Sequence, residues 1–167
     1  MRKPIMFREP RSIEFTVPGK AKAERKRQRG FTSKDGRVFG HRTDEPDRKG
    51  YKARIEGRAF TECHEQLGGD LLHGPLSAHF VVCMEQPPSY PKNPTNGKPW
   101  PEHWIAKPDA DNFAKLVSDA LTGIVWKDDA QVTDLSVRKR YGDRDMLHII
   151  VTEIVGGVKP PEEMPAL

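Results

Sequence analysis

The chain has 167 residues, of which 35% are hydrophobic, and it carries 28 Lys and Arg against 24 Asp and Glu. That length fits one domain, and no apolar run approaches the roughly 20 residues of a membrane span or follows the basic N-terminus as a secretory signal would. Two cysteines are too few for a disulfide framework or a four-cysteine zinc site. Composition therefore argues against a membrane or disulfide-rich secreted protein and predicts a cytoplasmic one.

The N-terminal third combines a short predicted strand with a strongly basic stretch. Residues 13–17 (IEFTV) predict a strand that Pro18-Gly19 ends. Residues 1–60 carry a net charge of +10, whereas the rest of the chain carries −6, and residues 20–42 hold nine Lys and Arg against two acidic residues. Because this stretch has three glycines and few apolar residues, we predict a basic mobile loop over residues 20–49.

The charge of this loop suits nucleic acid, because basic segments neutralise phosphates and gain affinity through counterion release. We therefore predict that the loop contacts nucleic acid through Lys20, Lys22, Arg25, Lys26, Arg27 and Arg29. The alternative is a solvated segment whose charge only keeps the chain soluble.

Two helices and a strand are predicted in the middle of the chain. Apolar residues at helical spacing predict a helix from about Arg48 to Leu67, and residues 76–84 (LSAHFVVCM) predict a strand. Six prolines between residues 87 and 101 predict a Pro-rich loop over residues 85–106. The clearest helix follows, since apolar residues from Phe113 to Ile124 form one stripe, with Asp111 as the predicted N-cap.

Two strands and a tail complete the chain. Residues 132–141 and 147–154, on either side of a turn at Gly142, predict an antiparallel hairpin. Residues 156–167 contain a Pro-Pro pair and predict a disordered tail. The order of elements predicts an α+β fold with a small mixed sheet and two helices, in a single domain over residues 1–155.

Two pairs of aspartates are the strongest candidates for a functional site. Asp109 and Asp111 flank the start of the second helix, whereas Asp128 and Asp129 follow it. The helix would be about 16–18 Å long, and an extended connection of roughly six residues could span that distance, so both pairs could converge at one end of the sheet. Clustered carboxylates repel each other unless a cation neutralises them, and hard oxygen ligands suit Mg²⁺.

Lys115 adds a positive charge to this candidate site. It lies four residues after Asp111, one turn along the same helix face. Acidic ligands with an adjacent lysine are what metal-assisted phosphodiester hydrolysis needs. The alternatives stay open that Lys115 only pairs with Asp111, that Asp109 or Asp111 only caps the helix, and that Asp128 and Asp129 only form a turn.

The segment KPDADNFAKLVSDALTGIVWKDDAQVTDLSVRKRYG, residues 107–142, closely resembles the RusA family of Holliday junction resolvases, small endonucleases associated with phages and prophages. The family signature is approximately K-P-D-x-D-N-x-x-K, then D-A-L-x-G, then D-D-x-Q-V and a basic strand. The resemblance extends weakly to the whole domain, because IEFTVPGKAKAERKR is similar to the family's opening strand, Pro-Gly turn and basic run. The Pro-rich insert and the long basic loop depart from the compact family pattern.

The resemblance implies a RusA-like C2 homodimer that cuts four-way DNA junctions with paired symmetric nicks, in DNA recombination and repair. The reaction would depend on Mg²⁺, with Mn²⁺ as a substitute ion. Asp109, Asp111 and Asp129 match the family's catalytic metal-binding aspartates, and Lys115 matches its catalytic lysine. Asp128 is expected as a supporting metal ligand.

Further residues are candidates for DNA or metal contacts, and other functions fit the same sequence. Basic residues alternate along the strand 132–141, so we predict DNA contacts by Arg138 and Arg140, the alternative being an exposed charged strand. Cys63, His64 and Cys83 lack the spacing of zinc ligands, so no zinc is expected. Two other functions stay open: a non-catalytic protein that binds branched DNA, and a nuclease that uses the same site on flaps or forks.

Overall fold

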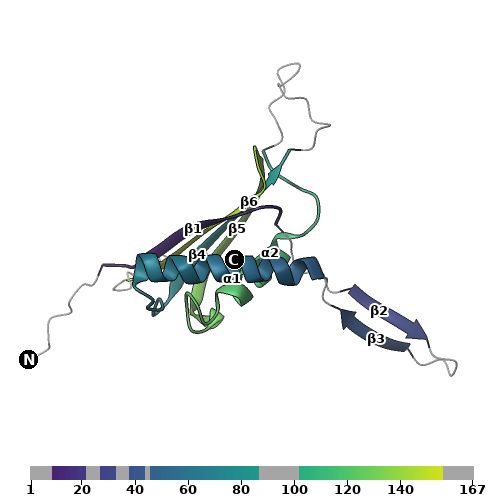
Figure 1. The fold of residues 1–167 in the computed structure, drawn as a ribbon, viewed down its shortest axis with the longest axis horizontal. Helices are drawn as coiled ribbons and strands as arrows, with labels where there is room; N and C mark the ends of the chain where they lie inside the picture. Colours follow the sequence, from purple (N-terminus) through teal and green to yellow (C-terminus); the bar gives the residue numbers. More distant parts are fainter. Residues whose placement is uncertain (1–8, 22–26, 33–37, 44–45, 87–101, 156–167) are drawn as a thin grey trace, which may run out of the picture.

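The computed structural model describes residues 9–21, 27–32, 38–43, 46–86 and 102–155, and its main body is a four-stranded mixed sheet with two helices against one face (Figure 1). The elements are β1 (Ser12–Pro18), β2 (Arg27–Thr32), β3 (Val38–Thr43), α1 (Pro46–Leu67), β4 (Leu76–Glu85), α2 (Ala110–Leu121), the short 3-10 helix η1 (Asp129–Gln131), β5 (Val132–Gly142) and β6 (Met146–Glu153). This architecture confirms the predicted α+β fold with a small mixed sheet. Among the described helices, none is long and apolar enough to cross a membrane.

The main sheet has the strand order β1-β6-β4-β5, with β4 parallel to β5 and antiparallel to β6. The predicted antiparallel hairpin of the last two strands is therefore wrong, because β4 lies between them. The crossover from β4 through α2 brings β5 beside β4 in parallel, as β-α-β connections do. The turn after β5 then passes the end of β4, where the Asp145 side chain accepts the Glu85 N–H at 2.8 Å.

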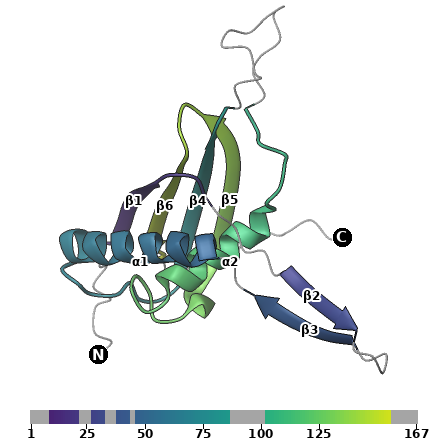
Figure 2. The same ribbon diagram turned by 45° about the vertical axis from the view of Figure 1, so that its right-hand side comes forward.

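A separate two-stranded sheet, β2 and β3, occupies part of the region predicted as a basic mobile loop over residues 20–49. The two strands pair antiparallel with Phe31 opposite Phe39, and the hairpin projects beyond the start of α1 (Figures 1 and 2). The loop prediction was wrong for these strands, because a hairpin ladder satisfies backbone hydrogen bonds without a markedly apolar sequence. Lys22, Arg25 and Lys26, most of the predicted Pro-rich loop and the predicted tail lie outside the described residues.

One apolar core lies between the helices and the covered face of the sheet. Every second residue of β1, β4 and β6 points into it, and α2 contributes the predicted stripe, of which Phe113, Leu116, Val117, Ala120 and Leu121 are buried. Trp104, near the end of the predicted Pro-rich loop, is also buried, with its ring centroid 5.9 Å from that of Phe113. The core therefore fixes α2 and the segment before it against β5.

A buried ion pair ties the N-terminal strand to the end of β6. Glu153 is 5% exposed and accepts hydrogen bonds from the Arg11 guanidinium at 2.7 and 3.1 Å. The backbone N–H of His73 donates to the same carboxylate at 2.9 Å. The Arg11 guanidinium also donates to the Leu71 carbonyl at 2.7 Å, so one charged pair links three segments.

We expect Glu153 to make folding stability depend on pH. Burial alone would raise the pKa of this carboxyl, but the hydrogen bonds from Arg11 and His73 outweigh it and lower the pKa from 4.5 to about 2. Because the folded-state pKa is the lower one, the stabilisation is complete above about pH 5 and is lost as the pH falls towards 2. In urea unfolding, Glu153→Gln should cost about 3 kcal/mol at pH 7 and roughly half of that at pH 3. An equal loss at both pH values would contradict this account.

Candidate active site

The first pair of candidate aspartates lies where the chain enters α2. Asp109 is the N-cap residue and Asp111 lies in the first helical turn, so the prediction of Asp111 as N-cap was wrong by two residues. Both side chains are exposed, and the Asp109 carboxylate makes no capping hydrogen bond. An N-cap aspartate usually accepts a backbone N–H of the first turn. The Asp109 oxygens are thus not used by the helix and are suited to an external ligand.

Lys139, on β5, holds the backbone immediately before this pair. Its Nζ donates to the carbonyl of Ala106 at 2.7 Å and to that of Pro108 at 2.6 Å. The same ammonium lies 4.4 Å from the ring centroid of Trp104, whose backbone N–H donates to the Lys139 carbonyl at 3.3 Å. This role of Lys139 was not predicted from the sequence. Strand alternation was the available signal, because it places Lys139 on the face opposite to Arg138 and Arg140.

The second pair lies in the turn that precedes β5. The Asp128 side chain accepts the Ala130 N–H at 2.9 Å, while the Gln131 side chain accepts the Asp128 N–H at 3.2 Å, which together form a capping box around η1. The Gln131 amide also donates to the Gly74 carbonyl at 3.2 Å. The spacing Asp128-x-x-Gln131 is the signature of this motif, so the sequence held a signal for a structural role of both residues. Asp129 is exposed beside them.

The two pairs do not gather into one cluster within this chain. The indole N–H of Trp126, just before the second pair, donates to the Thr122 hydroxyl at the far end of α2, so the pairs start from opposite ends of the helix. Among the described residues, which include all four aspartates, no three His, Cys, Asp or Glu side chains lie close enough to hold a metal ion. The predicted convergence of both pairs is therefore not found within a single chain.

The donor set nevertheless fits a hard divalent cation. Mg²⁺ is usually held by one or two carboxylates, with water and substrate phosphate completing its octahedron. Asp109 and Asp111 offer exposed carboxylate oxygens two residues apart, and Asp129 offers a third. Three protein ligands in one chain are not required for such a site.

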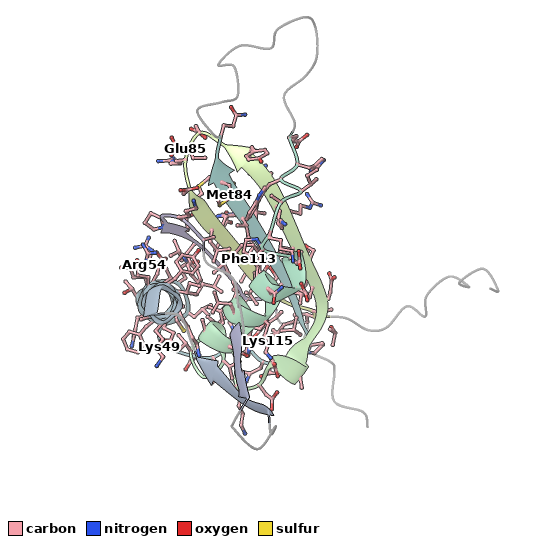
Figure 3. All side chains as sticks on the ribbon, turned by 90° about the vertical axis from the view of Figure 1, so that its right-hand side faces the viewer. Lys49, Arg54, Met84, Glu85, Phe113 and Lys115 are labelled. Atoms are coloured by element: carbon pink, nitrogen blue, oxygen red, sulfur yellow. The ribbon has the colours of Figure 1, made fainter. Side chains whose placement is uncertain are left out.

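The predicted basic residues lie in different places around these aspartates. Lys115 is exposed on α2, one turn beyond Asp111, while the neighbouring Phe113 is buried; Figure 3 labels both. Arg138 and Arg140 lie on the sheet face opposite to the helices, where the Arg140 guanidinium donates to Cys83 Sγ at 3.4 Å and this bond raises the pKa of Arg140. Lys20 is exposed at the end of β1, whereas only the backbone of Arg27 and Arg29 is described, in β2.

Comparison with known proteins relates the chain to a protein family and to a curated relative. A family model described as Endodeoxyribonuclease RusA matches residues 12–152. The chain is also similar to the uncharacterized protein YqaN of Bacillus subtilis (strain 168), with 32% identity over 146 residues that cover 85% of this chain and 96% of the relative. The family match spans both helices, all four aspartates and the main sheet except for the last residue of β6.

Proposed function

Because the chain belongs to the RusA family of endodeoxyribonucleases, we propose that it resolves four-way DNA junctions by paired symmetric nicks. Membership of this family implies hydrolysis of DNA phosphodiester bonds, with branched DNA as substrate and a divalent metal as cofactor. We further propose that the metal cofactor is Mg²⁺, for which Mn²⁺ can substitute. The protein would act in DNA recombination and repair in the cytoplasm, and it would originate from a phage or prophage. The observation that carries the proposal is the exposed pair Asp109 and Asp111 at the start of α2, inside the family match.

Each residue of the candidate site has a distinct proposed role. Asp109, Asp111 and Asp129 would hold the metal, and Asp128 would support the turn that carries Asp129. The bound metal supplies an activated water and stabilises charge on the attacking and leaving oxygens. Lys115 places a positive charge one turn beyond Asp111, where it stabilises the additional charge of a phosphate in the transition state. The basic residues of the β2–β3 region, with Arg138 and Arg140, are proposed DNA contacts.

A homodimer is proposed from the edge of β5. Residues 102–104 follow this edge at its C-terminal half, where the Tyr141 N–H donates to the Glu102 carbonyl at 2.9 Å. Between Thr133 and Val137 no backbone bond to another described residue is found on the outer edge, and Leu135 there is 45% exposed. Open edges of this kind pair with further strands. A second copy of the chain is the natural partner, because two symmetric nicks need two related active sites.

Antiparallel pairing of the two β5 edges would also bring the aspartates together. The start of β5 in one copy would then lie near the end of β5 in the other, where Lys139 holds the segment before Asp109. The turn with Asp129 would approach the start of α2 in the partner. Such a dimer would join the two aspartate pairs that one chain keeps apart.

The dimer is tested by placing a charge on the open edge. Leu135→Glu is expected to reduce the mass in solution from twice the chain mass of 18.9 kDa to that of one chain, because a carboxylate cannot pack across a strand interface. Light scattering after size-exclusion chromatography measures this mass. Phe60→Glu is the control, since Phe60 is 59% exposed on α1. A dimeric Leu135→Glu variant would place the interface elsewhere.

The activity is tested with labelled four-way junction, flap, fork and linear duplex, each with Mg²⁺ and with EDTA. Paired nicks at symmetric positions in the junction, only with Mg²⁺, are the expected result. Tight junction binding without nicks in Mg²⁺ or Mn²⁺ would instead indicate a non-catalytic protein that binds branched DNA. Preferential cutting of flaps or forks would support the same candidate site but indicate a different DNA substrate.

A further inference from the structure

A shallow groove runs between the end of β1 and one flank of α1, away from the candidate active site. It encloses about 400 Å³ and is lined by Val17, Pro18, Arg54, Gly57, Arg58 and Thr61. The four residues from α1 recur three or four positions apart, so they form one continuous flank of the helix. Two of them are arginines, and the groove therefore combines a positive charge with an apolar floor.

The Arg54 guanidinium is positioned without a carboxylate. Its Cζ lies 5.1 Å from the ring centroid of Tyr51, a buried residue one turn earlier on the helix. Its Nη1 lies 2.9 Å from the point that a Cβ on Gly19 would occupy, so the absent side chain of Gly19 makes room for it. No carboxylate partner of Arg54 is found in the described part of the chain. Ring and glycine thus hold the guanidinium, while its N–H donors stay available to a ligand.

Arg58 differs from Arg54 because its charge is already paired. Its guanidinium lies 2.5 Å from Glu62, a carboxylate that is 9% exposed and also accepts from Gln66 at 2.6 Å. The Arg58 side chain remains 49% exposed and lines the groove. Arg58 therefore supports the positive character of the groove, but Arg54 is the stronger candidate for binding an anion.

Gly57 is the second, independent sign of a ligand that approaches closely. It lies in the interior of α1, where glycine destabilises a helix relative to alanine. A Cβ at this position would meet no atom of the described residues within 4 Å, so packing against that part of the chain does not explain the glycine. Its absent side chain leaves bare helix backbone between Arg54 and Arg58, and that space is open to a partner.

We propose that this groove binds the phosphodiester backbone of the DNA substrate, with Arg54 as a phosphate ligand and Gly57 as the point of closest approach. DNA is the fitting occupant because guanidinium donors match phosphate oxygens in pairs. The groove also adjoins Lys20, which is exposed two residues after Pro18 on the segment leading to the basic hairpin. This inference rests on the proposed function, because it assigns a further DNA contact to a junction-cutting enzyme.

The test compares three variants for junction binding without divalent metal, between 50 and 200 mM salt. Arg54→Gln is expected to bind about tenfold more weakly at low salt and to reduce the slope of log K against log salt by roughly 0.9, the value for one lost phosphate contact. Gly57→Gln is expected to weaken binding severalfold while its Tm stays equal or rises, because Gln forms helices better than Gly. Lys49→Gln is the matched control, since Figure 3 labels Lys49 and Arg54 on different sides of α1.

Three other results of this test would contradict the proposed DNA contact, and one of them would also contradict the proposed function. If the wild type binds and cuts junctions but Arg54→Gln keeps the wild-type slope, the groove is not a DNA contact and the proposed function stands. If Gly57→Gln changes the mass of the protein in solution, the groove faces a second copy of the chain and the inference fails. A wild type that binds neither junction nor duplex would overturn the proposed function together with this inference.

Discussion

Asp111→Asn is expected to lower junction cleavage by at least about 10²–10³-fold while junction affinity stays within about twofold of the wild type. Asn keeps the shape of the side chain but removes the negative charge that a divalent cation needs. Asp111 is exposed in the first turn of α2, and its only bond among those described is from the Asn112 amide at 3.3 Å. The substitution therefore removes a metal ligand and leaves the fold intact. The lost interaction of the carboxylate with the helix dipole lowers the stability of the fold by less than about 1 kcal/mol.

Single-turnover cleavage of a labelled junction in Mg²⁺ measures the first quantity, and binding in EDTA measures the second. Asp119→Asn is the matched control, because Asp119 is exposed on the same helix, two turns further along. The control should cut at the wild-type rate. If Asp111→Asn also cuts at that rate, Asp111 is not a metal ligand and the candidate site must lie elsewhere.

The parts of the fold that local patterns determine were predictable from sequence. The apolar stripe of α2 has the period of a helix, and its residues from Phe113 to Leu121 are buried in the structure, whereas Ile124 follows the helix and is partly buried. The strand IEFTV and the strand LSAHFVVCM alternate in the structure between buried and less buried positions, as half-buried strands do. In these elements the spacing of apolar residues already determines which face is buried, so the sequence alone is enough to predict the element and its buried face.

The errors concern choices that a local pattern does not encode. The order of β5 and β6 depends on which strand takes the centre of the sheet, and β4 does so because of the crossover through α2. The hairpin of β2 and β3 has little apolar sequence and depends on backbone pairing. The separation of Asp111 from Asp129 depends on how the chain turns after α2, where Trp126 donates to Thr122. Each outcome is set by contacts between segments far apart or by the path of a turn.

Lys139→Met is expected to lower cleavage by about 10–10²-fold and to raise the Mg²⁺ concentration needed for half-maximal rate severalfold. Met keeps the length and apolar stem of the side chain against Trp104, but it cannot donate to the carbonyls of Ala106 and Pro108. Without these two bonds the backbone before Asp109 is free to shift, and a displacement of about 1 Å in a catalytic group can cost 10²-fold. Lys139 acts through Asp109 and is therefore a positioning residue.

A shift in the metal requirement separates this role from a purely structural one. A variant that is only less stable would lose active protein in proportion, with the same Mg²⁺ dependence as the wild type, whereas a misplaced Asp109 must weaken metal binding itself. Arg138→Met is the control, because it removes the same charge from the adjacent residue on the opposite face of the sheet, away from Ala106 and Pro108. Its Mg²⁺ titration should match the wild type, while its salt dependence of DNA binding should flatten if Arg138 touches phosphate. If Lys139→Met and the wild type gave the same half-maximal Mg²⁺ concentration, the two lysine bonds would serve the fold alone, and the geometry of Asp109 would have to be set by α2 itself.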